Sequence, residues 1–218
     1  MFWTLLFSTS GGALPPAYFL NFNNFNLIFR VPHDVSAVLP YKAIRPAMLR
    51  ARLQSYPPMP NTLRGLFQVL TLPQNQDITS TRDAADNILA SSAGHSRDRS
   101  RCIIFMSERQ KRYARRVTKV FVDATYDPIP ASLLPDCKQV LNFSATWRNH
   151  TLPLARVLMQ GKDAVAQVAV LEELRRLVPA FNPASVMADF DQAQFLAWLQ
   201  VFPNTRRKGC LFHYVQVL

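Results

Sequence analysis

The sequence predicts an α/β fold in which a three-stranded antiparallel meander is followed by parallel strands connected through helices. Three observations support this fold class. Of all residues, 49% are hydrophobic and only 18% are charged, so the chain can bury a core. Short apolar runs typical of strands dominate from residue 102 onward. Amphipathic helical segments separate the later runs, which is typical of parallel crossover units.

The expected strands are short runs bounded by turn residues. They cover residues 102–105, 119–125, 139–147, 152–159, 185–188 and 210–215.

The expected helices follow from apolar residues spaced three and four positions apart. The clearest covers residues 163–178, where Glu172 also precedes Arg176 by four positions. Further helices are expected over residues 61–72, 108–116 and 191–201.

Three regions are expected along the chain. Residues 1–55 form an irregular arm, in which prolines leave room for one short helix over residues 47–54. Residues 56–100 form a helical and loop region, and residues 101–218 form the α/β core. The uncharged start of the chain lacks the about 20 continuous apolar residues of a membrane helix. We therefore expect no membrane span and no signal peptide.

The cysteines indicate a reducing compartment, because Cys102, Cys137 and Cys210 are odd in number and widely spaced. Cys210 and His213 have the spacing of half a four-ligand zinc site. The remaining cysteines and histidines do not form a second pair with suitable spacing. A structural zinc site is therefore not expected.

The formal net charge of +11 favours a polyanionic partner, and most of it is concentrated. Residues 97–119 carry nine basic and two acidic side chains, a local net charge of +7. Phosphate contacts dominate nucleic-acid affinity, so double-stranded DNA is the expected partner. A solvated helix face is the alternative for this segment. The candidate DNA-binding residues are Arg109, Lys111, Arg112, Arg115, Arg116, Lys119, Arg206, Arg207 and Lys208.

Two carboxylates lie at strand ends. Asp123 follows the apolar run 119–122, and Asp189 follows the run 184–188. If these two strands are neighbours, the carboxylates share one edge of the sheet, where ligands of open α/β sheets bind. Paired carboxylates suit a hard cation such as Mg²⁺. The alternative is that each aspartate caps a strand or the following helix.

Four segments together resemble the transposases of Mutator-like elements, over about residues 56–218. They are KVFVDATY (119–126), LPLARVLMQGK (152–162), VMADFDQA (186–193) and GCLFHYVQ (209–216). The resemblance implies an RNase H-like core, with Asp123 and Asp189 as the first two catalytic acids and metal ligands. Cys210 and His213 match the family's C-x-x-H element, which implies a role for His213 in the site. The departures are mild: Ala124 replaces the usual Gly, Tyr126 the usual Phe and Asp191 the usual Glu.

The resemblance also implies Mg²⁺- or Mn²⁺-dependent DNA cleavage and strand transfer, a nuclear location and a homo-oligomer. The family's third acid lies further on than Leu218, so we expect a partial transposase that is catalytically incompetent alone. A second hypothesis is a transposase-derived nuclear protein that binds DNA without catalysis. A third is an RNase H-like interaction domain whose charge serves only solubility.

Overall fold

The computed structural model describes residues 46, 47, 50, 56–81, 86–95, 97–126, 129–147 and 150–216. The chain divides into two compact units, Met1–Pro58 and Met59–Leu218, and the sheet lies in the second. Residues 46, 47 and 50 are helical, and the other residues of the short helix expected over 47–54 lie outside the described residues. The expected arm, residues 1–55, also lies almost entirely outside them.

A mixed sheet in the order β1-β2-β5-β4-β3-β6-β7 forms the centre of the second unit. Antiparallel pairing connects β1 through β3, whereas β6 pairs parallel with β3 and with β7. The predicted α/β class, with a meander followed by parallel strands, is thus confirmed. The strands are β1 (Leu89–Ala93), β2 (Cys102–Phe105), β3 (Lys119–Thr125), β4 (Gln139–Trp147), β5 (His150–Met159), β6 (Ser185–Ala188) and β7 (Arg206–Gly209).

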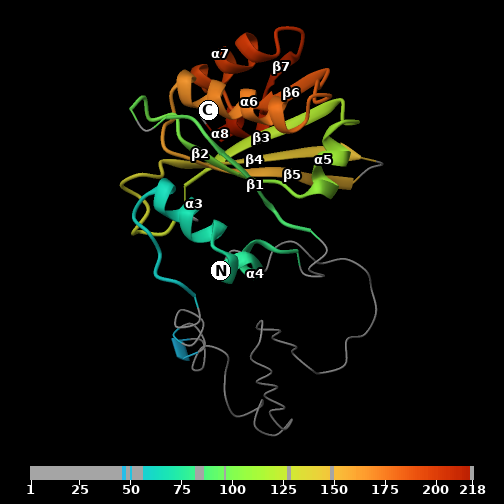
Figure 1. Ribbon diagram of the computed structural model, residues 1–218. Coiled ribbons are helices and arrows are strands. Elements are labelled where there is room, and N and C mark those ends of the chain that lie inside the picture. The colour runs from blue at the N-terminus through green and yellow to red at the C-terminus, as the bar shows by residue number, and fades with distance from the viewer. Residues whose placement is uncertain are drawn as a thin grey trace, which may run out of the picture. The chain divides into compact units, whose positions relative to one another are not determined.

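Helices cover both faces of the sheet, and Figure 1 shows α6 and α7 on one side of β4 and β5 and α3 on the other. We call these the α6 face and the α3 face. The helices are α3 (Leu63–Thr71), η1 (Pro73–Asn75), α4 (Gln76–Thr79), α5 (Glu108–Ala114), α6 (Ala164–Leu177), α7 (Gln192–Val201) and α8 (Leu211–Gln216).

The alternation of side chains along each strand gives each face its own core. Val122, Phe143 and Ala155 are paired across three strands and belong to the cluster that also contains buried residues of α5, α6 and α7. Ile103, Leu158 and Val140 are likewise paired, and they pack with the leucines of α3. Residues 120, 122 and 124 therefore belong to the α6 face, and residues 119, 121, 123 and 125 to the α3 face.

Local capping explains where the helices on the α6 face begin. The Ser107 hydroxyl and the Gln110 side chain form a capping box at the start of α5. The Asp163 side chain accepts a hydrogen bond from the Ala166 amide at the start of α6, and the Asp191 side chain accepts one from Gln194 at the start of α7.

Sequence reasoning missed strand β1. Its sequence, LASSA, is small and polar rather than β-branched, so intrinsic propensity does not favour a strand. Pairing with β2 stabilises the strand instead. The turn that joins β1 to β2 begins at Gly94, whose φ is 77°. A Cβ atom on Gly94 would lie 2.2 Å from the Ser100 carbonyl oxygen.

The strand predicted over residues 210–215 is wrong, because this segment forms helix α8. The strand is the basic run Arg206–Gly209 before it, which pairs only with β6 and ends where β6 ends, at Ala188. Beyond Gly209 no strand among the described residues pairs with the backbone, so its amide and carbonyl groups form hydrogen bonds with each other in a helix. The Tyr214 amide donates to the Cys210 carbonyl oxygen at 3.1 Å.

Candidate active site

The two predicted acids lie on neighbouring strands. Strand β3 pairs parallel with β6 in the register Phe121↔Met187, so the strands predicted over residues 119–125 and 185–188 are neighbours. Asp123 lies two residues after Phe121, and Asp189 lies two residues after Met187. Side-chain alternation therefore places both carboxylates on the α3 face at the same end of the sheet. Their side chains are 59% and 49% exposed.

Helix α8 brings His213 between the two carboxylates. Its Nε2 atom lies 3.7 Å from Asp123 Oδ1, and its Nδ1 atom lies 3.9 Å from Asp189 Oδ1. Both distances exceed those of a hydrogen bond. The buried Nδ1 atom has no hydrogen-bond partner among the described residues, whereas Asp189 Oδ1 accepts a bond of 2.7 Å from the Phe190 amide. Three residues predicted from separate motifs thus meet in one place.

Phe190 and Gly209 hold α8 beside the sheet end. The Cys210 amide donates to the Ala188 carbonyl oxygen at 2.8 Å, which continues the pairing of β6 and β7 to the start of the helix. The Phe190 ring covers Gly209, where a Cβ atom would lie 2.4 Å from the ring, and contacts Tyr214 with ring centroids 6.1 Å apart. The absence of a side chain on Gly209 therefore helps to place the His213 helix.

The two carboxylates at this end supply some of the ligands that one hard cation needs. Two carboxylates that converge on a common neighbour suit Mg²⁺ or Mn²⁺, which are usually bound by one or two carboxylates together with water and phosphate. The nearby Asp191 caps α7 and accepts from the Gln194 amide at 3.1 Å. Among the described residues, no group of three or more His, Cys, Asp or Glu side chains is arranged to hold a metal ion.

The remaining cysteines lie in the two cores rather than beside Cys210. Cys102 belongs to the core of the α6 face and Cys137 to the core of the α3 face. Burial raises the pKa of the Cys102 thiol to about 12 and that of Cys137 to about 11. Both thiols therefore stay protonated at neutral pH, whereas zinc binds thiolates.

Three predicted DNA-binding residues share the α3 face with the carboxylates. Strand pairing aligns Ser185 with Arg206 and Met187 with Lys208, and it aligns Lys119 with Ser185. We call Lys119, Arg206 and Lys208 the basic stripe, and all three are exposed. At about 3.3 Å per residue, Lys208 lies about 7 Å along the strands from the carboxylate row. Lys119 and Arg206 lie about 13 Å away.

Arg207 lies on the opposite face. Its guanidinium lies over the Phe195 ring of α7, 4.7 Å from the centroid. Its Nε and Nη1 atoms are buried, and no residue in the described part of the chain forms a hydrogen bond with them. It is therefore separated from its sequence neighbours Arg206 and Lys208, although all three were candidates for the same role.

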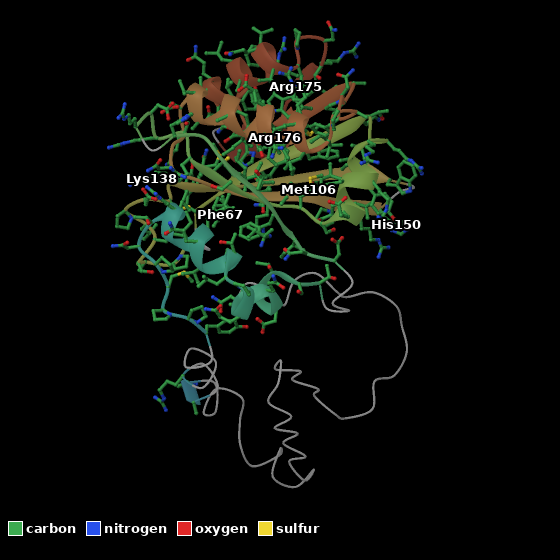
Figure 2. The ribbon with its side chains drawn as sticks, in the orientation of Figure 1. Phe67, Met106, Lys138, His150, Arg175 and Arg176 are labelled. Atoms are coloured by element: carbon green, nitrogen blue, oxygen red, sulfur yellow. The ribbon has the colours of Figure 1, made fainter. Side chains whose placement is uncertain are left out.

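The other predicted basic residues lie on α5 and in the two residues after it, at the end of the sheet opposite the carboxylates. Figure 2 labels Lys138 and His150, which mark the carboxylate end and the α5 end respectively. Arg109, Arg112 and Arg116 line a hollow of about 330 Å³ together with Tyr113, which we call the α5 hollow. Lys111 instead pairs with Glu108 at 2.6 Å, and Arg115 is exposed at the C-terminal cap of α5.

Sequence reasoning missed a further polar pair beside Asp123. Strand pairing aligns Asp123 with Asn142 and Asn142 with Arg156, so all three lie on the α3 face. The Arg156 Nε group donates to Asn142 Oδ1 at 2.9 Å, and Arg156 is exposed. Its only sequence signal was its position within the segment LPLARVLMQGK, because the pairing that brings it near Asp123 depends on register.

Comparisons with known proteins do not identify this chain. No protein-family model matches it, and no curated protein matches it significantly. Among the residues that the structure describes, no helix has the length and apolar character needed to cross a membrane.

Proposed function

We propose that the chain is an RNase H-like domain of the Mutator-like transposase type that binds double-stranded DNA along the α3 face. The meeting of Asp123, Asp189 and His213 carries this proposal, because the three residues come from separate motifs of the resemblance. The sheet adds support, since a meander of β3, β4 and β5 with parallel β6 and β7 beside β3 is the arrangement that the resemblance implies.

The position of the basic stripe indicates the path that a bound DNA strand would follow. Its three side chains are exposed on the face that carries the carboxylates, and the described residues show no ion pair to any of them. Phosphates bound to this stripe would bring a DNA strand to Asp123 and Asp189 along β3, β6 and β7. Arg156 would hold a phosphate on the other side of Asp123.

Asp123 and Asp189 would hold a divalent cation between them. Such a cation would supply Lewis-acid stabilisation of the charge that develops on a phosphate ester. His213 lies between the same two carboxylates, so its imidazole would turn aside or contact a bound phosphate when the cation enters. Asp123 and Asp189 alone cannot enclose two cations, so we expect this chain to bind DNA without cutting it.

A non-catalytic DNA-binding protein of the same origin is the second candidate. The position of His213 favours it, because the imidazole lies between the acids that would otherwise hold a cation. Both candidates require DNA binding by the stripe, and they differ in whether the carboxylates bind metal.

The test combines metal binding, DNA binding and cleavage on the same purified chain. We expect Mn²⁺ binding, measured by paramagnetic resonance, to be lost in Asp123→Asn and in Asp189→Asn. Asp77 is an exposed acid that is distant in sequence from both carboxylates. Asp77→Asn is therefore the matched control and should retain Mn²⁺ binding. Equal Mn²⁺ binding by all variants would contradict the metal site and leave the non-catalytic candidate.

Nicking of supercoiled DNA separates the remaining outcomes. We expect no nicking with Mg²⁺ or Mn²⁺, together with duplex binding that weakens as salt rises. Nicking that disappears in Asp189→Ala would show that the chain is catalytically competent by itself. Absence of duplex binding at low salt would contradict the proposed function and leave only an interaction domain.

A further inference from the structure

The α5 hollow combines positive charge with an aromatic wall. Arg109 and Arg112 lie three positions apart on one side of α5, and Arg116 follows in the turn after the C-cap residue Arg115. Tyr113 completes the lining, and its ring centroid lies 6.2 Å from that of Trp147 at the end of β4. The volume of about 330 Å³ is at the lower end of the range for small-molecule sites.

The scaffold around the hollow is well anchored. The Gln110 Nε2 group donates to the Pro153 carbonyl oxygen at 3.0 Å, which ties α5 to β5. Ala114 is buried in the core of the α6 face, and Tyr113 packs against that core. Figure 2 places His150, which begins β5, at the sheet end where Figure 1 shows α5. Tyr113 and Trp147 are therefore held by the fold rather than free to move apart.

The arginines of the hollow are available for a ligand. All three are exposed, and among the described residues none of them forms an ion pair with an acid. The one acid of α5, Glu108, is paired with Lys111. Guanidinium groups suit phosphate because their planar donors match two of its oxygens. An aromatic pair beside them suits a flat, uncharged ring.

We propose that the α5 hollow binds an unpaired nucleotide of a DNA strand, with the base against Tyr113 and Trp147 and the adjoining phosphates on the arginines. The inference rests on the proposed function, because it adds a second contact to the same DNA. A base inside a duplex is stacked on its neighbours and cannot enter the hollow. The hollow therefore recognises single-stranded DNA, a duplex end or a distorted duplex, whereas the basic stripe binds regular duplex DNA.

Binding of two labelled oligonucleotides, measured by fluorescence anisotropy, tests this difference. One is a single strand of about 16 nucleotides, and the other is a fully paired hairpin. Tyr113→Leu should weaken single-strand binding about tenfold and leave hairpin binding unchanged, because base stacking is lost. Tyr113→Phe keeps the ring and should retain single-strand binding. Circular dichroism and thermal unfolding establish that both variants are folded.

Two charge variants on the same helix locate the phosphate contacts. Arg112→Gln removes a charge from the hollow, and Arg115→Gln removes one from a residue that does not line it. We expect Arg112→Gln to weaken single-strand binding about tenfold and Arg115→Gln less than about threefold. Equal effects of the two variants would overturn the inference.

Tryptophan fluorescence gives a direct readout of the base. In a chain that carries Trp3→Phe, a strand in the hollow should quench Trp147, whereas Trp198 is 1% exposed and cannot stack with a base. Trp147→Phe should abolish most of the quenching but retain binding. Quenching that persists in this variant would overturn the inference.

The outcomes also separate this inference from the proposed function. Hairpin binding that depends on the basic stripe, without preferential effects of Tyr113→Leu on the single strand, would overturn the inference alone. Failure to bind either oligonucleotide would overturn both. Displacement of the single strand by an equal concentration of a free mononucleotide would assign the hollow to a small nucleotide and overturn the DNA-strand assignment.

Discussion

The basic stripe and the α5 hollow carry the same type of charge but are built in different ways. The stripe draws Lys119, Arg206 and Lys208 from separate strands, and the pairing of β3, β6 and β7 brings them to one face. The hollow draws Arg109 and Arg112 from α5 and Arg116 from the turn that follows it. The stripe therefore depends on strand pairing, whereas the arginines of the hollow come from one continuous segment.

The two surfaces also differ in their neighbours. The stripe leads to two carboxylates and an imidazole, whereas the hollow is lined by Tyr113, which has the Trp147 ring beside it. The stripe lies on the α3 face, whereas α5 packs against the core of the α6 face. Six of the nine candidate residues therefore lie on two separate surfaces, for which we propose different ligands.

The largest expected effect on duplex binding comes from removing charge on alternate residues of β7. Arg206→Gln and Lys208→Gln should each weaken duplex binding several-fold at low salt. Each should also reduce the slope of log affinity against log salt by about 0.9, because one phosphate contact is lost. Anisotropy titrations of a DNA hairpin over a salt series measure both quantities.

Arg207→Gln is the matched control for this comparison. It removes the same charge from the same strand, but the Arg207 side chain lies over Phe195 on the other face. The salt slope should stay that of the wild-type chain, although the free energy of unfolding should fall by about 1 kcal/mol as the cation–π contact is lost. Equal salt slopes for all three variants would show that net charge, and not strand register, determines duplex binding.

Much of the fold was predictable because local sequence and tertiary structure agree. Strands β2, β3, β4 and β6 have the expected bounds, since apolar residues in these segments are also the ones that the sheet buries. Asp123 and Asp189 were expected to share one edge of the sheet if their two strands were neighbours, and the parallel pairing of β3 with β6 meets that condition.

The remaining features depend on pairing that no single segment encodes. The charged run Arg206–Gly209 becomes a strand because β6 offers it an edge, and the apolar run after it becomes a helix because that edge ends. The separation of Arg207 from Arg206 follows from the same pairing. Arg156 lies near Asp123 only because the registers of β3 with β4 and of β4 with β5 place Asn142 between them.

A change on α6 should affect stability without altering either surface. Glu173 is buried, and the Arg176 guanidinium and the Ser91 hydroxyl donate hydrogen bonds to it, which joins α6 to β1. The hydrogen bond from Arg176 lowers the pKa of Glu173 below its ordinary value near 4.5, and the one from Ser91 adds to this. Glu173→Gln should reduce the free energy of unfolding by about 1–3 kcal/mol at neutral pH.

The pH dependence of this variant follows from the direction of the shift. A carboxylate whose pKa is lower in the folded chain stabilises it above the unfolded value, and this contribution is lost as pH falls through the folded value. Urea unfolding should thus show the gap between wild type and Glu173→Gln closing below about pH 4.5. Altered binding of the hairpin or the single strand at neutral pH would show that the two surfaces are coupled through the sheet. A pH-independent gap would show that the hydrogen bonds to Glu173 do not require its charge.

The smallest expected effect on stability comes from Gly209→Ala. The new Cβ atom would meet the Phe190 ring at 2.4 Å, but Phe190 is 63% exposed, so the ring can turn away at a cost of about 1 kcal/mol or less. Its contact with Tyr214 would then be lost, and α8 would shift relative to the carboxylates. The His213 imidazole resonances, measured by nuclear magnetic resonance, should therefore change although the unfolding midpoint changes little.

Phe190→Ala removes the same contact without adding a Cβ atom and should shift these resonances in the same direction. Both variants should leave single-strand binding by the α5 hollow unchanged, because the hollow lies at the other end of the sheet. Unchanged His213 resonances in both would show that the β7 pairing alone positions α8, and that Phe190 has no part in bringing the imidazole between Asp123 and Asp189.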